Sequence, residues 1–138
     1  MRIFLDANIL FSAAKSDGAV RLLLELLTAE AHVLCADGYV AEEARRNLAA
    51  NGPTGLVELA ALLDRLEVAP AQADPDSMAA ARALPEKDRP VLFAAARMKC
   101  EVLVTGDRTH FGSFYGRLPG GVAIHSPRSL AEWLFDTK

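Results

Sequence analysis

The sequence predicts an α/β domain in which helices cover both faces of a parallel sheet. Short β-rich runs alternate with stretches that carry apolar residues at helical spacing, and glycine and proline mark the boundaries between them. The 138 residues fit one domain of ordinary size, and 51% hydrophobic with 24% charged residues is typical of a globular chain. We therefore expect a single folded domain over residues 1–138.

The expected strands are short runs rich in β-branched and other apolar residues. In chain order they are Arg2–Leu5, His32–Cys35, the weaker Leu66–Ala69, Glu101–Thr105 and Val122–His125. Helical stretches separate most of these runs along the chain. Parallel pairing is therefore expected, because parallel strands need a crossover connection of that kind.

Helices are expected where apolar residues recur every three or four positions. The stretches with this spacing are Val20–Ala31, Tyr39–Ala50, Thr54–Leu66, Ser77–Leu84, Pro90–Lys99 and Pro127–Phe135. A further helix should begin near Asn8. The turn sequences agree with these boundaries, since Asn-Gly-Pro at 51–53 closes one helix and opens the next, and Pro-Gly-Gly at 119–121 precedes the last strand.

Charge and terminal sequence exclude several classes of protein. The apolar run at the N-terminus is broken by Asp6 and Asn8, so we expect neither a signal peptide nor a membrane span, and we expect a cytoplasmic location. A net charge of −3 provides no global positive field, so any nucleic-acid contact must come from a local patch. Cys35 and Cys100 form no CxxC pair, which indicates buried thiols and not a cysteine metal site.

Four acids fall at one edge of the predicted sheet. Asp6 and Asp107 directly follow strands, whereas Glu43 and Asp88 lie in the first turns of helices. The carboxyl ends of parallel strands and the amino ends of the following helices share one edge, which is where ligands bind in open α/β folds. Taken singly, each acid has an ordinary structural explanation as a helix cap or a partner of the helix dipole. Taken together, the four acids predict a ligand-binding site at this edge of the sheet.

Helix geometry separates the neighbouring acids Glu42 and Glu43. Glu43 borders the apolar face of its helix, whereas Glu42 falls on the opposite side. Glu42 and Arg46 have the i,i+4 spacing of a stabilising ion pair. We therefore predict that Glu42 is a solvated surface acid and that Glu43 points inward.

A cluster of carboxylates predicts a bound cation. Carboxylates repel one another by roughly 4 kcal/mol per pair at 4 Å and an effective dielectric of 20. Oxygen ligands without a His/Cys spacing favour Mg²⁺ or Mn²⁺, which bridge a few carboxylates to substrate phosphate. Such an ion lowers the pKa of bound water and stabilises a leaving oxygen, as phosphodiester hydrolysis requires.

These residues resemble the motifs of PIN domains, in particular those of small prokaryotic nucleases of the VapC-like toxin type. FLDANILFSA resembles the family's opening aspartate motif, and VAEEARRNL resembles its acidic helix. EKDRPVLFAAARMKCEVLVTGD resembles the stretch with the third and fourth acids, and TGDRTHF resembles the common ending. The likeness runs in the right order over nearly the whole chain.

The resemblance implies a fold, an activity and a set of partners. It implies a three-layer α/β/α sandwich around a parallel sheet, Mg²⁺- or Mn²⁺-dependent RNA cleavage and a toxin role that an antitoxin chain opposes. The implied catalytic and metal-binding acids are Asp6, Glu43, Asp88 and Asp107, and the implied polar supports are Asn8 and Thr105. An apolar helical stretch with Leu22, Leu23 and Leu26 also leads us to expect a homodimer, although these leucines have an ordinary explanation as core.

Two positions depart from the family pattern. Ala7 stands where many members carry threonine or serine, and no further acid follows Asp107 in its loop, so a second metal has no evident ligand there. That loop carries basic residues instead. Basic side chains near the acid edge are candidate substrate contacts, because phosphate contacts position a nucleic acid without reading its sequence. They are Arg45, Arg46, Arg89, Arg108 and His110.

Other functions fit the sequence less well. A phosphatase of the type with an aspartate after its first strand would show DxDx, but Asn8 occupies the second acid position. No GxxxxGK[ST] or GxGxxG motif is present, which excludes the common nucleotide-binding loops. The serious alternative is a PIN-like scaffold with little catalysis that acts as a protein- or RNA-binding module.

Overall fold

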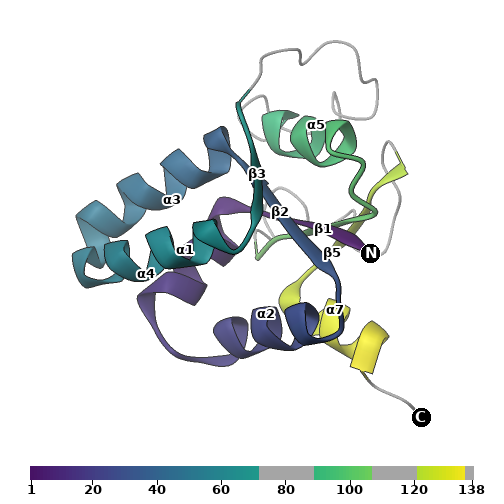
Figure 1. Cartoon of the computed structure of the whole chain (residues 1–138), viewed down its shortest axis with the longest axis horizontal. Coiled ribbons are helices and arrows are strands. Elements are labelled where there is room, and N and C mark those ends of the chain that lie inside the picture. The colour runs from purple at the N-terminus through teal and green to yellow at the C-terminus, as the bar shows by residue number, and fades with distance from the viewer. Residues whose placement is uncertain (72–88, 107–120, 136–138) are drawn as a thin grey trace.

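The computed structural model describes residues 1–71, 89–106 and 121–135 (Figure 1). Within these residues the chain forms a five-stranded sheet and six α-helices. In chain order the elements are β1 (Arg2–Leu5), α1 (Ala7–Lys15), α2 (Ala19–Ala29), β2 (Val33–Asp37), α3 (Gly38–Asn51), the 3-10 turn η1 (Pro53–Gly55), α4 (Leu56–Asp64), β3 (Glu67–Ala69), α5 (Arg89–Arg97), β4 (Val102–Val104), β5 (Ala123–His125) and α7 (Pro127–Phe135).

All neighbouring strands of the sheet are parallel, in the order β3-β2-β1-β4-β5. The central strand β1 pairs with β2 on one side and with β4 on the other, so that Phe4 lies opposite Cys35 and Leu103. Ile3, Phe4 and Leu5 are all fully buried. A strand reads as a continuous apolar run in this way when both faces of its sheet are covered, which confirms the predicted parallel sheet.

Helices lie on both sides of this sheet. Helix α5 packs against β2 and β4, whereas α1, α2 and α4 pack together on the other side (Figure 1). The predicted three-layer α/β/α arrangement is therefore confirmed. Among the described elements, none of the helices has the length and apolar character needed to cross a membrane.

Several boundaries differ from those that the sequence predicts. The expected helix Thr54–Leu66 is divided into the 3-10 turn η1 and α4, because Gly52 and Pro53 start a tight turn before regular helix begins. Strand β2 continues two residues beyond the predicted end at Cys35. The predicted helix Ser77–Leu84 lies outside the described residues.

The two cysteines are buried, whereas the leucines of α2 are divided between the core and the surface. Cys35 and Cys100 are buried free thiols, as the sequence predicts. Leu23 is buried in the core, whereas Leu22 and Leu26 are exposed on the outer side of α2. The core explanation therefore holds for Leu23, and the other two leucines remain available for contacts between chains.

Helix α7 is held against the end of β5 by an aromatic stack. The rings of His125 and Trp133 lie 5.3 Å apart with an interplanar angle of 7°. Nδ1 of His125 lies 3.0 Å from the hydroxyl of Ser129, and burial lowers the pKa of the imidazole. The fold therefore favours the neutral form of His125.

The first prediction concerns the pH dependence of stability. Because the folded state lowers the pKa of His125, its contribution is present above the unfolded value of about 6.5 and is lost as the pH falls through the folded pKa. The free energy of unfolding should therefore decrease between about pH 7 and 5. Urea unfolding should show a smaller decrease for His125→Phe, which keeps a ring beside Trp133. An identical pH dependence of parent and variant would contradict the prediction.

Candidate functional site

Asp6 lies where the central strand ends and the first helix begins. The backbone of Asp6 is still extended, with φ −70° and ψ 163°, and its Oδ1 accepts a hydrogen bond from the backbone N–H of Ala7 at 2.7 Å. Asp6 is the N-cap residue of α1, but its side chain accepts from the first helical N–H instead of the second or third, which a capping aspartate usually binds. The residue is only 7% exposed, so its carboxylate is held in a fixed position at the carboxyl edge of the sheet.

Two polar residues join Asp6 to the end of the neighbouring strand β4. The buried hydroxyl of Thr105 donates to Oδ2 of Asp6 at 2.7 Å. The amide of Asn8 donates to the Thr105 hydroxyl at 3.4 Å, and its Oδ1 accepts from the backbone N–H of Gly106 at 2.9 Å. The structure thus brings together Asp6, Asn8 and Thr105, immediately before the point in the sequence where Asp107 follows.

The two neighbouring acids of α3 differ in burial. Glu43 is partly buried and Glu42 is exposed, as the helix-face argument predicts. The predicted pair between Glu42 and Arg46 is wrong, because Glu42 binds Arg45 instead. Arg45 donates from Nε at 2.9 Å and from Nη2 at 2.5 Å to the two carboxylate oxygens, and this bidentate geometry is stronger than a single contact.

The structure adds an acid, Asp37, that the sequence analysis missed. Asp37 ends β2 and caps α3, because its Oδ1 accepts from the N–H of Val40 at 3.2 Å. Phe4 pairs with Cys35, and continuing this register by two residues places Asp37 opposite Asp6. The signal was the same one that identified Asp6, an acid directly after a buried strand, but the predicted strand stopped too early to show it.

Asp37 is one of the most buried polar residues that the structure describes. It is 2% exposed, and burial raises the pKa of its carboxyl group despite the hydrogen bond from Val40 and the nearby positive charge of Arg97. Nη2 of Arg97, in the last turn of α5, lies 3.7 Å from Oδ2 of Asp37. A buried carboxylate that faces a guanidinium in this way links β2 and α3 to the helix on the other side of the sheet.

The structure describes only some of the other predicted site residues. Asp88, Asp107, Arg108 and His110 lie outside the described residues, and Arg89 is placed only as the first residue of α5. Arg45 and Arg46 are exposed on α3. Across residues 1–71, 89–106 and 121–135, no three His, Cys, Asp or Glu side chains are grouped so that they could hold a metal ion. The four-acid site therefore stays a prediction.

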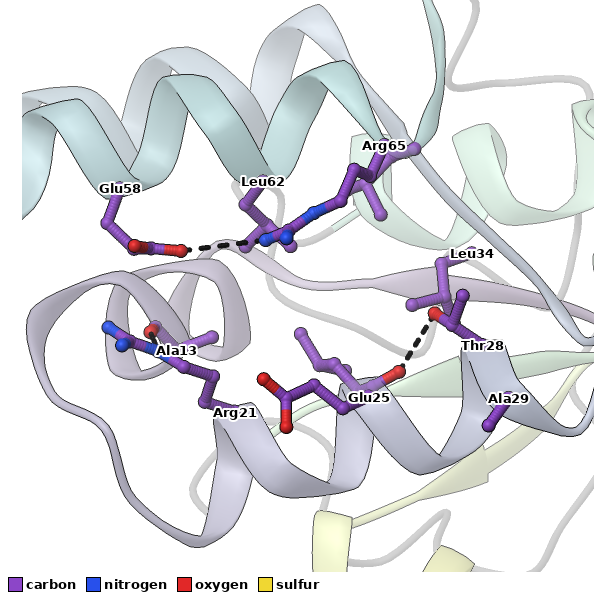
Figure 2. Close-up of a pocket in the computed structure, with 11 residues that line it drawn as sticks. Ala13, Arg21, Glu25, Thr28, Ala29, Leu34, Glu58, Leu62 and Arg65 are labelled. Carbon is purple, nitrogen blue, oxygen red and sulfur yellow. Dashed lines mark hydrogen bonds and ion pairs between the residues drawn. The ribbon is translucent and has the colours of Figure 1, made fainter.

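A separate pocket lies between α2 and α4, in the helical layer that covers one face of the sheet (Figure 2). It encloses about 280 Å³, and its apolar lining includes Leu24, Leu34 and Leu62. Charged groups surround this lining. Nη2 of Arg65, the C-cap residue of α4, lies 3.5 Å from Oε2 of Glu58, and Figure 2 marks this ion pair with a dashed line. The pocket therefore combines an apolar lining with charged groups of both signs.

Comparisons by sequence and by structure give different results. No protein-family model and no curated protein matches the sequence. VapBC2 from Rickettsia felis, solved with a promoter DNA fragment, matches the structure with a TM-score of 0.66 at 17% identity, over 91% of this chain and 98% of the matched chain. The PIN domain endonuclease Utp24 matches with a TM-score of 0.53 at 18% identity, over 91% of this chain and 84% of the other. The chain has the PIN-domain fold.

A further PIN-domain match agrees with these two. VapC20 from Mycobacterium tuberculosis, a toxin that cleaves the Sarcin-Ricin loop, matches with a TM-score of 0.58 at 14% identity, over 80% of this chain and 94% of the other. The fold that the resemblance implied is therefore confirmed. At these identities the likeness establishes the PIN fold, and the chemistry must be argued from the residues of this chain.

Proposed function

We propose that this PIN domain is a metal-dependent endoribonuclease that hydrolyses RNA phosphodiester bonds and acts as the toxin of a toxin–antitoxin pair. The observation that carries the proposal is the buried carboxylate of Asp6, which Ala7 and Thr105 hold at the carboxyl edge of the sheet. The proposal is further supported by the activities of two proteins that share the fold, the Sarcin-Ricin loop cleaving toxin VapC20 and the endonuclease Utp24.

The donor atoms at this edge fit a hard divalent cation. Asp6 places both oxygens of its carboxylate at this edge, where they accept hydrogen bonds from Ala7 and Thr105. With Glu43, Asp88 and Asp107 it provides an all-oxygen ligand set, which suits Mg²⁺ or Mn²⁺. When bound, such an ion lowers the pKa of coordinated water and stabilises the leaving oxygen.

The chain's own residues would hold the acids and the substrate in place. Asn8 and Thr105 fix the Asp6 carboxylate through hydrogen bonds to the end of β4, so that it does not have to be ordered during the reaction. Arg46 lies three residues beyond Glu43 on α3 and is exposed, whereas Arg45 is engaged by Glu42. Arg46 is thus the better phosphate contact of the two, and Arg89, Arg108 and His110 are further candidates.

The second prediction is that the purified chain cuts single-stranded RNA only with added Mg²⁺ or Mn²⁺. Chelation should stop cleavage, since neither water activation nor charge stabilisation remains without the ion. Sequencing the RNA ends left in cells after brief induction would identify the target and the cleavage position. A folded chain that neither binds Mn²⁺ nor cuts RNA would instead support the alternative, a PIN scaffold that acts as a binding module.

We also propose an antitoxin protein and a second copy of the chain as partners. The pocket between α2 and α4 offers an apolar lining with charged groups around it, which suits an amphipathic antitoxin segment (Figure 2). Leu22 and Leu26 are exposed and provide an apolar surface for self-association. Coexpression of the antitoxin should restore the growth of induced cells, and light scattering of the purified chain would show whether it is a dimer.

A further inference from the structure

A partly buried ion pair connects α3 and α5. Asp37 stands at the amino end of α3, the helix that carries Glu43. Arg97 lies in the last turn of α5, the helix that begins directly after Asp88 in the sequence. The side chain of Asp37 is 3% exposed and that of Arg97 is 28% exposed, so solvent screens this pair far less than it screens a surface pair.

Both oxygens of Asp37 have structural partners. Oδ1 accepts the N–H of Val40 and fixes the first turn of α3, and Oδ2 faces Nη2 of Arg97 at 3.7 Å. That Nη2 atom is itself buried, and it has no hydrogen-bond partner among the described residues. A buried guanidinium nitrogen without a hydrogen bond is costly, and the negative charge of Asp37 is the interaction that compensates it. The Asp37 carboxylate therefore joins the first turn of α3 to the last turn of α5.

The ion pair between Asp37 and Arg97 lies at the junction of β2 and α3, close in the sequence to Glu43. Continuing the register of Phe4 and Cys35 by two residues places Asp37 level with Asp6, which follows β1. Glu43 follows Asp37 by six residues, about 9 Å along the helix that Asp37 caps. Any change in how α3 leaves β2 therefore moves Glu43 relative to Asp6. Arg97 restrains this junction from the opposite helical layer of the domain.

We propose that Asp37 and Arg97 are positioning residues, which hold α3 so that Glu43 and Asp6 can share one divalent cation. The proposal rests on the nuclease function above. The variants that test it, Asp37→Asn and Arg97→Met, should both fold. Asp37→Asn keeps a side-chain oxygen that can accept the N–H of Val40. In Arg97→Met an apolar side chain of similar length replaces the buried stem of the arginine.

The test is a Mn²⁺ titration by calorimetry, combined with RNA cleavage kinetics. Asp37→Asn and Arg97→Met should each weaken Mn²⁺ binding on the order of tenfold, as loss of an orienting partner does, and should lower kcat more than they raise KM. Arg97→Lys should retain most of the affinity, because it keeps the positive charge. The control Glu132→Gln removes one charge from an exposed ion pair on α7 and should change neither quantity.

Each contrary result has a distinct meaning. If Asp37→Asn and Arg97→Met both keep the Mn²⁺ affinity of the parent and only melt at a lower temperature, the ion pair has a structural role alone and the proposal is overturned. Complete loss of binding in Asp37→Asn with normal binding in Arg97→Met would make Asp37 a metal ligand instead. A parent that binds no Mn²⁺ would refute the nuclease function itself, and that outcome is read from the parent alone. If Arg97→Met does not fold, Asp37→Asn and Arg97→Lys still decide the question.

Discussion

Asp6→Asn should lower RNA cleavage by on the order of a hundredfold or more under saturating Mg²⁺, because a weakened metal site loses both water activation and charge stabilisation. The substitution keeps the shape of the side chain. An Asn oxygen can still accept the N–H of Ala7, and the hydroxyl of Thr105 can rotate to accept from the new amide. The loss should therefore come from the missing negative charge and not from unfolding, which a melting curve of the variant would verify.

A matched acid on α3 provides the control for this experiment. Glu42→Gln also removes one carboxylate, but Glu42 is exposed and paired with Arg45, so cleavage should change little. Asp107→Asn should reproduce the loss seen in Asp6→Asn. If the Asp6/Asp107 double variant still cuts RNA as fast as the parent, the cutting comes from a contaminating nuclease. The proposed ribonuclease function would then have no support.

The parallel sheet could be predicted because its strands are buried on both faces. Ile3, Phe4 and Leu5 form an uninterrupted apolar run, and a strand with one solvated face would have alternated instead. Boundaries were harder to predict, as β2 shows. Its last residues, Ala36 and Asp37, are buried in the sheet, but an aspartate before a glycine has the composition of a turn.

The helix cap at Asp6 could be predicted from the sequence. Asp6 was identified because an acid after a strand both caps a helix and faces the ligand edge, and the structure shows that it does cap α1. The role of Asp37 depends on Arg97, which lies 60 positions later in the sequence, and no local pattern shows that contact. Helix spacing alone predicted that Glu42 pairs with Arg46. In the structure Glu42 pairs with Arg45 instead, in a bidentate geometry that spacing does not show.

Leu27→Ala should produce the largest loss of stability among the changes considered, about 2–5 kcal/mol in the free energy of unfolding. Leu27 is completely buried in α2, and truncating it removes apolar contacts and leaves a cavity in the layer between helix and sheet. For a domain of this length, such a loss corresponds to a fall in melting temperature of about 10 °C.

The neighbouring leucine makes this prediction specific. Leu26 is 44% exposed in the same helix, so Leu26→Ala deletes the same atoms and should cost less than about 1 kcal/mol. Leu27 lies close to the start of β2, since its carbonyl oxygen accepts the N–H of His32, and is thus remote from the carboxyl edge where Asp6 lies. At a temperature where Leu27→Ala is still folded, its metal-dependent cleavage rate should therefore match that of the parent. Equal melting temperatures for the two leucine variants would show that α2 does not cover the sheet as described, whereas a loss of cleavage in folded Leu27→Ala would show that packing at the amino edge controls the acid site.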